Sequence, residues 1–471
     1  MNDVSKRSVP TGTKLAFGVG MLANQMFPAA LGVFMVVLVE GLGFPPLWWG
    51  FIAFAPRLFD AVTDPIMGFI SDNTRSRWGR RRPYVFIGSL ILGISYIAMW
   101  QLHRENSLTF NFCYFMAFSL LFYLGLTIFS VPYVAMGYEM SEDFHERTDI
   151  MSVAQFIGQW AWVIVPWFWV ILYNPDYFST PDAGVRELSV WVGISCAILA
   201  MVPALFIPSD STVHRSEFKP VTVRAIIGSL GDIARETIEA FGIRQFRQLA
   251  IATFFIFNSF NIIASFTFFI IVHYLFSGSV EEAGIWPAIH GSVGALITTF
   301  LVIPAVTILS RRIGKKQAFI ASQTVSIIGY VLFWFLFVPG QPALFLLALP
   351  FHSFGIGGLF TLMMSMTADV CDLDEFQHGK RREGTLGAVY WWMVKFGLAF
   401  SGLLAGLIMA FVEFDPKAVT PSAMTGMRLF YSILPVTGVI LAICVMWRYD
   451  ISESKAASIR KALEERRKQQ A

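Results

Sequence analysis

The sequence predicts an all-α membrane protein whose twelve transmembrane helices form two six-helix bundles. The chain has 471 residues, of which 55% are hydrophobic and 14% charged, and its mean hydropathy is +0.60. This composition is typical of a helical protein that crosses a membrane several times, and it excludes an ordinary soluble protein. Apolar runs of 18 or more residues recur along the chain. Each can cross about 30 Å of hydrocarbon as a helix, and none has the alternation of a barrel strand.

We expect twelve spans, separated by polar segments. Their predicted ranges are 15–39, 48–70, 83–102, 109–136, 150–173, 189–207, 248–276, 284–309, 316–338, 342–366, 385–411 and 427–447. The longest internal polar segment divides the chain into an N-terminal bundle (1–207), a central cytoplasmic loop (208–247), a C-terminal bundle (248–447) and a cytoplasmic tail (448–471). Apolar residues at helical spacing between Ile226 and Phe241 predict that the central loop holds an amphipathic helix on the membrane surface.

Basic residues fall mostly on one side of the predicted spans. Of the 35 lysine and arginine residues, 29 lie in the N-terminus, the loops on its side and the C-terminal tail, and four lie in or beside the opposite loops. The positive-inside rule therefore predicts cytoplasmic termini, and we expect a multi-pass protein of the inner (plasma) membrane. The net charge of +3 gives no reason to expect nucleic-acid binding, and the four cysteines lack the spacing of a metal or redox site. We expect no cofactor and no structural metal.

Three charged residues lie inside the predicted span 48–70. Arg57, Asp60 and Asp64 are spaced i, i+3 and i+7, so a helix would place them on one face. Each costs roughly 2.5–3.5 kcal/mol at a helix centre, even on the mildest insertion scale. They should therefore face a polar cavity that forms a pathway for a cation or a solute. The alternative is a structural ion pair between Arg57 and Asp60, which does not account for Asp64.

Several motifs of this chain resemble those of one transporter family. Asp60-Ala-Val-Thr-Asp64-Pro-Ile-Met-Gly, followed by Thr74-Arg-Ser-Arg-Trp-Gly79, is similar to the second helix and the next loop of the glycoside-pentoside-hexuronide:cation symporters, the melibiose permease-like family of the major facilitator superfamily. Weaker similarities are Lys14-Leu-Ala-Phe-Gly, Val131-Pro-Tyr, the stretch from Glu139 to Arg147, Ala368-Asp-Val-Cys-Asp and Val394-Lys395. The resemblance covers nearly the whole chain and implies the major facilitator fold.

The resemblance also implies a cation site. In this family the two aspartates of the second helix are cation ligands, which assigns that role to Asp60 and Asp64. Thr127 matches a hydroxyl ligand, and Lys395 matches a lysine close to the site. Carboxylates suit a hard cation or a proton. Lys395 can compete with the ion for the carboxylates or simply neutralise one of them.

The chain departs from the family pattern at several positions. Gln25 and Ser130 stand where carboxylates are expected, Gln155 replaces an arginine, and Val134 replaces an aromatic residue. Because the third acidic ligand is missing, both a proton and sodium remain open as the coupling ion. Melibiose itself is also doubtful as the solute.

Amide, aromatic and charged side chains on several spans are expected to bind the solute. Amides donate and accept hydrogen bonds, as sugar hydroxyls require, and Trp162 shares one helix face with two of the glutamines. The candidates are Asn24, Gln25, Arg57, Ser130, Gln155, Gln159, Asn258, Asn261, Trp391 and Trp392. An amide can instead make an interhelical hydrogen bond worth about 0.6–2 kcal/mol. A tryptophan can instead pack in the core or at the membrane interface.

Charged residues in the cytoplasmic loops are expected to form a gate. Alternating access needs bonds that exist in one state and break in another. The candidates are Asp72, Arg75, Arg77, Arg80, Glu139, Asp143, Arg147, Asp369, Asp372 and Arg382. The alternative for any one arginine is a topology signal alone.

Together these features predict a secondary active transporter that couples uptake of a sugar or glycoside to H+ or Na+. Its expected partners are a small solute, a monovalent cation and the lipid bilayer. One alternative is a cation-coupled transporter of a non-sugar solute such as a lysolipid, because the resemblance extends to animal lysophosphatidylcholine transporters. Another is a non-transporting membrane sensor. We expect no enzyme, because the sequence shows no nucleophile with a base, no metal-ligand cluster and no phosphate loop.

Overall fold

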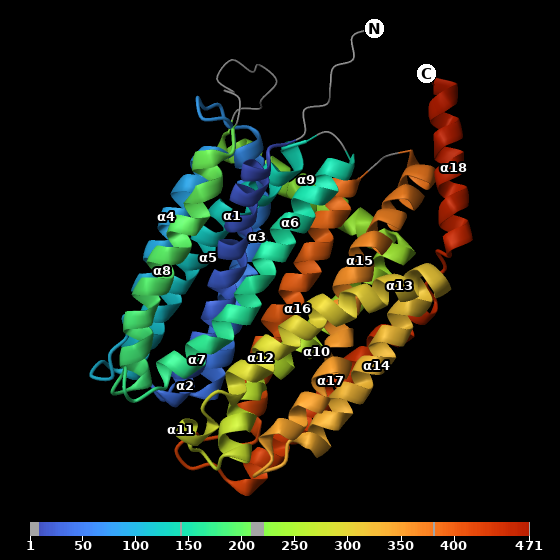
Figure 1. Cartoon of the computed structure of the whole chain (residues 1–471). Helices are drawn as coiled ribbons and strands as arrows, with labels where there is room; N and C mark the ends of the chain where they lie inside the picture. Colours follow the sequence, from blue (N-terminus) through green and yellow to red (C-terminus); the bar gives the residue numbers. More distant parts are fainter. Residues whose placement is uncertain (1–8, 142–143, 209–220, 380–381, 471) are drawn as a thin grey trace. The chain divides into compact units, whose positions relative to one another are not determined.

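The computed structural model describes residues 9–141, 144–208, 221–379 and 382–470, and within these ranges the chain is helical without strands (Figure 1). The α-helices are α1 (Thr11–Phe34), α2 (Val36–Glu40), α3 (Pro46–Asp72), α4 (Arg82–Met99), α5 (Leu108–Glu139), α6 (Phe144–Ile164), α7 (Phe168–Leu172), α8 (Pro181–Phe206), α9 (Val223–Gly242), α10 (Arg244–Phe269), α11 (Val280–Ala283), α12 (Trp286–Ile297), α13 (Ile303–Ile313), α14 (Lys315–Leu336), α15 (Leu349–His378), α16 (Glu383–Phe411), α17 (Pro421–Trp447) and α18 (Glu453–Gln470). Short 3₁₀ or π segments are η1 (Val165–Trp167), η2 (Ile270–Leu275), η3 (Thr298–Val302) and η4 (Pro342–Leu347).

The predicted spans coincide with these helices. In the described part of the chain, 11 helical segments are long and apolar enough to cross a membrane. The remaining predicted span, 48–70, lies in α3, a continuous helix of 27 residues that carries Arg57, Asp60 and Asp64. Some helices run past the predicted ends, as α15 does to His378 and α17 does from Pro421, because a helix keeps its backbone hydrogen bonds beyond the apolar run. The twelve-helix prediction is confirmed.

The first compact unit comprises Met1–Phe44 and Phe59–Leu230. In it α1 packs against α6 and α8, and α4 packs against α5 and α8. Gly88 lets α4 approach α5 closely, because a Cβ there would lie 2.5 Å from the backbone nitrogen of Phe129. Aromatic rings fill the interior of this unit; they belong to Phe27, Phe34, Tyr96, Trp100, Phe115 and Phe122. This packing holds α5, which carries Thr127.

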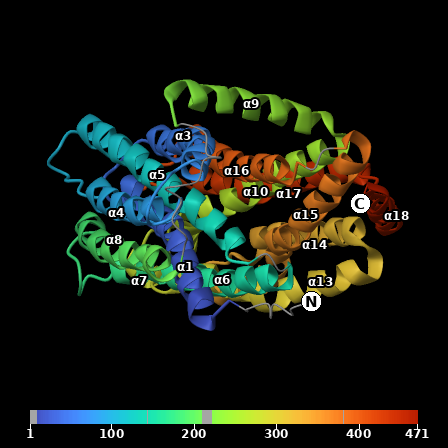
Figure 2. The ribbon, with the colours of Figure 1, turned by 90° about the horizontal axis from the view of Figure 1, so that it is seen from above.

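The second compact unit comprises Pro45–Leu58 and Gly231–Ala471. Here α10 packs against α15, α16 and α17, and Figure 2 shows α10 beside α16 and α17. Gly329 brings α14 against the backbone of α15, because a Cβ there would overlap the nitrogen of His352. By this division α3 contributes its first part to the second unit and its remainder to the first.

Two helices lie outside the predicted spans. α9 occupies Val223–Gly242 within the predicted central loop, and its Val223, Ile227 and Ile238 are exposed; its place on a membrane surface stays a prediction. α18 was not expected from the charged tail. It packs against α15 and buries Ile459 and Leu463. The spacing i, i+4 of these two residues was the signal in the sequence.

Candidate functional site

Two aspartates and two threonines converge between α3 and α5 in the first unit. Thr127 Oγ1 lies 2.7 Å from Asp60 Oδ1, 3.0 Å from Asp64 Oδ1 and 3.0 Å from Thr63 Oγ1. Asp60 and Thr127 are only 4% and 1% exposed, whereas Asp64 is half-buried. The structure therefore brings three of the four predicted cation-coupling residues together. It adds Thr63, which lies between the aspartates in the sequence motif and was overlooked.

One hydroxyl cannot satisfy both carboxylates at the same time. A threonine has a single O–H donor, yet oxygens of Asp60 and Asp64 both lie within hydrogen-bonding distance of Thr127 Oγ1. Two ionised carboxylates that share one partner repel each other, and burial adds a desolvation cost. This arrangement is favourable only with a positive charge at the pair, which a proton, a metal cation or a cationic side chain can supply.

The fourth predicted coupling residue, Lys395, lies on α16 in the second unit. Its side chain is half-buried. Its role toward the aspartates stays a prediction.

Gln25, Gln155 and Trp162 form a hydrogen-bonded cluster between α1 and α6. Gln25 Nε2 donates to Gln155 Oε1 at 3.1 Å, and Trp162 Nε1 donates to Gln25 Oε1 at 2.7 Å. Gly158 makes room for this contact, because a Cβ there would lie 2.7 Å from Gln25 Nε2. Gln155 and Trp162 are exposed. A ligand can therefore reach both the amide and the indole edge of this cluster.

Three other predicted solute ligands contact the backbone of α16 in the second unit. Arg57 Nη1 donates to Leu398 O at 2.8 Å, and Asn261 Nδ2 lies 3.4 Å from the same oxygen and 2.5 Å from Ser401 Oγ. Asn258 Nδ2 lies 3.5 Å from the backbone oxygen one residue before Leu398. For the two asparagines, interhelical hydrogen bonds of this kind were the alternative to solute binding that the sequence left open, whereas for Arg57 the alternative was an ion pair with Asp60.

Small residues line the contact of α3 with α16. A Cβ at Gly406 would lie 2.6 Å from the Cα of Gly50, and a Cβ at Gly402 would lie 2.5 Å from the Cβ of Ala53. Small residues four positions apart let membrane helices approach at backbone distance. We call this contact the α3–α16 seam.

The remaining solute candidates are dispersed over both units. Asn24 lies on α1, Ser130 on α5 and Gln159 on α6, while Trp391 and Trp392 lie on α16. Within the described residues no hydrogen bond joins them to the glutamine cluster or to the Arg57 contact. Trp391 is exposed and packs edge-on against Tyr390.

Three predicted gate residues of the first unit, Asp72, Arg80 and Glu139, share one charge network with Arg81. Glu139 Oε1 lies 2.5 Å from Arg80 Nη2 and 2.7 Å from Arg81 Nε, and Arg81 Nη2 lies 2.7 Å from Asp72 Oδ1. Arg81, which is buried, thus links the loop after α3 to the end of α5.

Other predicted gate residues of this unit have different surroundings. Arg147 Nε donates to Ser141 O at 2.5 Å, and Arg75 and Arg77 are exposed. Asp143 lies outside the described residues.

Asp369 and Asp372 pair with residues of their own unit. Asp369 Oδ2 lies 2.5 Å from Lys315 Nζ, and its Oδ1 lies 2.6 Å from Arg460 Nη2. Arg460 Nε also lies 3.0 Å from Asp372 Oδ2. Sequence reasoning missed Arg460 because it lies in the tail.

Arg382 is held by two helices of the second unit. Its guanidinium lies 2.7 Å from Asp374 Oδ1 on α15 and 2.6 Å from Glu239 Oε2 on α9. Thr385 Oγ1 also donates to Glu236 on α9. The structure thus ties α9 to the connection between α15 and α16.

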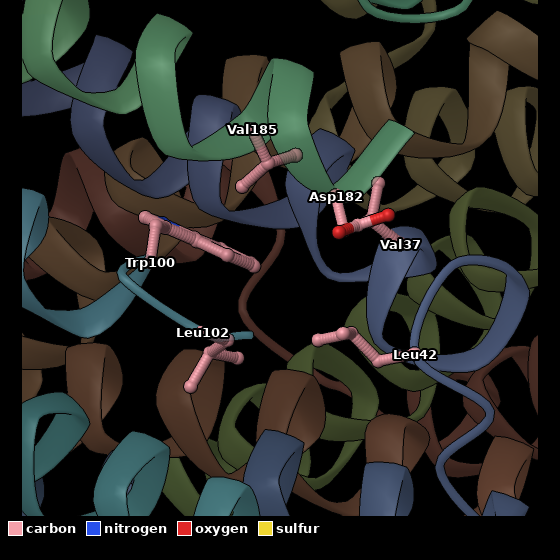
Figure 3. A pocket seen from close by; sticks show the side chains of 6 residues that line it. All are labelled: Val37, Leu42, Trp100, Leu102, Asp182 and Val185. Atoms are coloured by element: carbon pink, nitrogen blue, oxygen red, sulfur yellow. The ribbon is translucent and has the colours of Figure 1, made fainter. Parts of the chain in front are cut away.

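A small cavity in the first unit is lined by Val37, Leu42, Trp100, Leu102, Asp182 and Val185 (Figure 3). The Asp182 carboxylate is paired with Arg104 at 2.6 Å and Arg186 at 3.0 Å. The cavity volume of about 10 Å³ has room for about one water. It is not a solute site.

Comparison with known proteins places the chain in a class of membrane transporters. Residues 16–453 match the family model described as MFS/sugar transport protein. The glucuronide carrier protein homolog of Escherichia coli is 25% identical over 97% of this chain and 95% of its own length. The putative glycoside/cation symporter YagG of Escherichia coli is 22% identical over 96% and 94%. The lactose permease of Lactobacillus helveticus is 24% identical over 86% of this chain and 62% of its own length.

Solved structures share the fold. A bacterial homolog of the human lysosomal transporter Spinster aligns with a TM-score of 0.68 at 15% identity, covering 96% of this chain and 98% of the other. A D-xylose-proton symporter aligns with a TM-score of 0.63 at 14% identity, covering 94% and 98%. The chain belongs to the glycoside-pentoside-hexuronide symporter family of the major facilitator superfamily and is a multi-pass membrane transporter.

Proposed function

We propose that this protein is a symporter that couples the uptake of a sugar or glycoside to H+ or Na+ across the inner (plasma) membrane, with both termini in the cytoplasm. The observation that carries the proposal is the pair of carboxylates around Thr127. Asp60 Oδ1 and Asp64 Oδ1 both approach one hydroxyl, at 2.7 and 3.0 Å. A site of this kind takes up a positive charge to relieve repulsion between buried carboxylates.

Each coupling ion suits the site in its own way. A proton shared between Asp60 and Asp64 lets one carboxyl donate and the other accept. Sodium takes oxygen ligands, which the two carboxylates and the threonine hydroxyls can supply, as hard cations prefer.

The glutamine cluster of α1 and α6 is the proposed solute contact. Gln25, Gln155 and Trp162 together offer donors and acceptors for hydroxyl groups, and the exposed indole offers an apolar face. Relatives named as carriers of glucuronide, lactose and glycosides support a sugar-like solute.

α3 links the ion site to the α3–α16 seam. Arg57 lies about one turn before Asp60, and its guanidinium bonds the α16 backbone. An ion that draws Asp60 and Asp64 together shifts α3, and the same helix forms the seam with α16. The seam and the Glu139 and Asp369 charge networks are the proposed parts that rearrange between the two access states.

The test is accumulation in proteoliposomes. Labelled lactose, melibiose and a phenyl glucuronide are each offered under an imposed proton gradient, a sodium gradient or no gradient. We expect one solute to accumulate under one gradient, and we expect the matching ionophore to abolish that accumulation. Asp60→Asn should lose accumulation, while Glu281→Gln, which removes an exposed carboxylate elsewhere, should keep it. Accumulation by Asp60→Asn equal to that of the unaltered protein would contradict the ion assignment.

A further inference from the structure

The second unit contains an open groove between the start of α10 and the end of α17. Its volume is about 590 Å³, which is within the range of a pocket for a small ligand. Three arginines line it: Arg244 and Arg247 from α10, and Arg448 from the residue after α17. The rest of the lining is largely apolar and includes Phe255 and Cys444. The groove therefore combines three positively charged side chains with a largely apolar surface.

The three arginines have no carboxylate partner among the described residues. Arg244 Nη2 donates to Arg448 O at 3.2 Å, and Arg247 Nη1 donates to Phe241 O at 3.0 Å. A guanidinium has five N–H donors, so these backbone contacts leave most donors for another acceptor. A nearby acid, Asp450, is already held by Lys455 and Gln245, each at 2.9 Å. Three clustered positive charges favour an anionic ligand, and arginine binds phosphate oxygens in a bidentate manner.

Gln248 also lines the groove, and its side-chain oxygen is buried. Gln248 is 9% exposed, and its Nε2 donates to Val445 O at 3.0 Å. Gln248 Oε1 is buried without a hydrogen-bond partner in the described part of the chain. A buried acceptor without a hydrogen bond is unfavourable. The ligand that completes this site therefore carries a hydroxyl donor as well as an anion.

The position of the groove decides between a free phosphate compound and a lipid. It lies at the ends of two membrane-spanning helices, where a basic pocket meets the headgroup layer of the bilayer. Leu441 and Cys444 are exposed on its wall, and acyl chains can cover them. A free phosphate ester has no acyl chain and would leave these two apolar side chains uncovered.

We propose that the groove between α10 and α17 is a binding site for an anionic phospholipid with a hydroxylated headgroup, of the phosphatidylglycerol type. The phosphate contacts Arg244, Arg247 and Arg448, a headgroup hydroxyl donates to Gln248 Oε1, and an acyl chain covers Leu441 and Cys444. The proposal does not depend on which solute or ion the protein transports.

Cys444 provides a direct test, and Cys113 provides an internal reference. Both thiols are exposed, whereas Cys196 and Cys371 are buried. The purified full-length protein in detergent is mixed with phosphatidylglycerol, phosphatidylcholine or inorganic phosphate. Alkylation of each cysteine by N-ethylmaleimide is then followed by peptide mass spectrometry. We expect phosphatidylglycerol to slow the alkylation of Cys444 severalfold relative to Cys113, and the other two additions to leave the ratio unchanged.

Two other outcomes of that experiment would overturn the proposal. Equal protection by phosphatidylcholine would show a bilayer contact without headgroup recognition. Equal protection by inorganic phosphate would show an anion site without a lipid.

Variants test the contribution of the arginine charges separately from that of the apolar surface. Arg244→Gln, Arg247→Gln and Arg448→Gln should each reduce the number of phosphatidylglycerol molecules retained in native mass spectrometry. Arg311→Gln, which removes an exposed charge at the end of α13, should retain the full number. Leu441→Trp keeps every charge and fills the wall, so it should also reduce retention. Full retention in the monodisperse Arg and Leu441 variants would refute the site.

Discussion

The guanidinium of Arg57 donates to the backbone oxygen of Leu398 at 2.8 Å. This bond joins α3 to α16 about one helical turn before Asp60, so one continuous helix, Pro46–Asp72, carries both the seam contact and the carboxylate pair. We predict that ion binding at the carboxylate pair acts on the seam through this helix.

Removing the hydroxyl of Thr127 should weaken ion coupling more than it weakens folding. In Thr127→Val, the carboxylate pair loses its shared hydroxyl donor, a hydrogen bond to a charged group worth about 1.5–3 kcal/mol. The ion concentration for half-maximal uptake should rise by about tenfold or more. Thr127→Ser keeps the hydroxyl and should behave nearly as the unaltered protein. Equal ion dependence in the Val and Ser variants would show that the hydroxyl does not serve the ion.

A larger side chain at Gly406 should force the α3–α16 seam apart. A Cβ there would already lie 2.6 Å from the Cα of Gly50, so Gly406→Leu cannot be accommodated without moving a helix. We expect uptake to fall by at least tenfold, because the seam can no longer close. The rate of solute exchange across proteoliposomes measures this loss.

Gly387→Leu is the matched control on the same helix, since a Cβ at Gly387 meets no atom within 4 Å. It should keep most of the activity. Similar losses in both variants would point to a general intolerance of α16 rather than to the seam.

Replacing Gln25 should lower the affinity for the solute and leave the ion dependence unchanged. Gln25→Leu removes the hydrogen bonds to Gln155 and Trp162, each worth about 1 kcal/mol. The cluster then loses its geometry, and the KM for the solute should rise about tenfold. Gln341→Leu, at an exposed position before η4, is the control. An unchanged KM would move the solute site away from α1 and α6.

Arg460 and Lys315 should contribute non-additively to stability, because both pair with the buried carboxylate of Asp369. Arg460 is 53% exposed on its side chain, so Arg460→Gln alone should cost only about 1 kcal/mol. Combining it with Lys315→Gln leaves Asp369 without either cation and should cost more than the two single changes together. Thermal unfolding midpoints of the four proteins of this double-mutant cycle measure the excess.

Lys461→Gln is the control, because Lys461 neighbours Arg460 and has no ion pair in the described structure. It should leave the midpoint unchanged. An additive cycle would show that Asp369 does not need both partners.

Particular residues show how far sequence reasoning reached. Asp60, Asp64 and Thr127 were predicted to act together, and the structure places them around one hydroxyl. Arg57, Asn258 and Asn261 were predicted to bind solute; that role stays a prediction, and each of them contacts the backbone of α16. An amide on an apolar helix looks the same in sequence whether it faces a cavity or a neighbouring carbonyl. Only the packing partner distinguishes the two, and that partner lies more than a hundred residues away.

The sequence by itself determined the membrane-spanning helices, their number and the charged second span, because the length and composition of an apolar run are local properties. It also carried the motif that names the family. The tertiary structure alone decided which side chains share a partner: the hydroxyl between Asp60 and Asp64, the glutamine cluster, the backbone contact of Arg57 and the arginine groove of α10 and α17. Each of these depends on the rotation and close approach of helices that are distant in sequence. That geometry is set by glycines and interlocking side chains in contact, which no single span specifies.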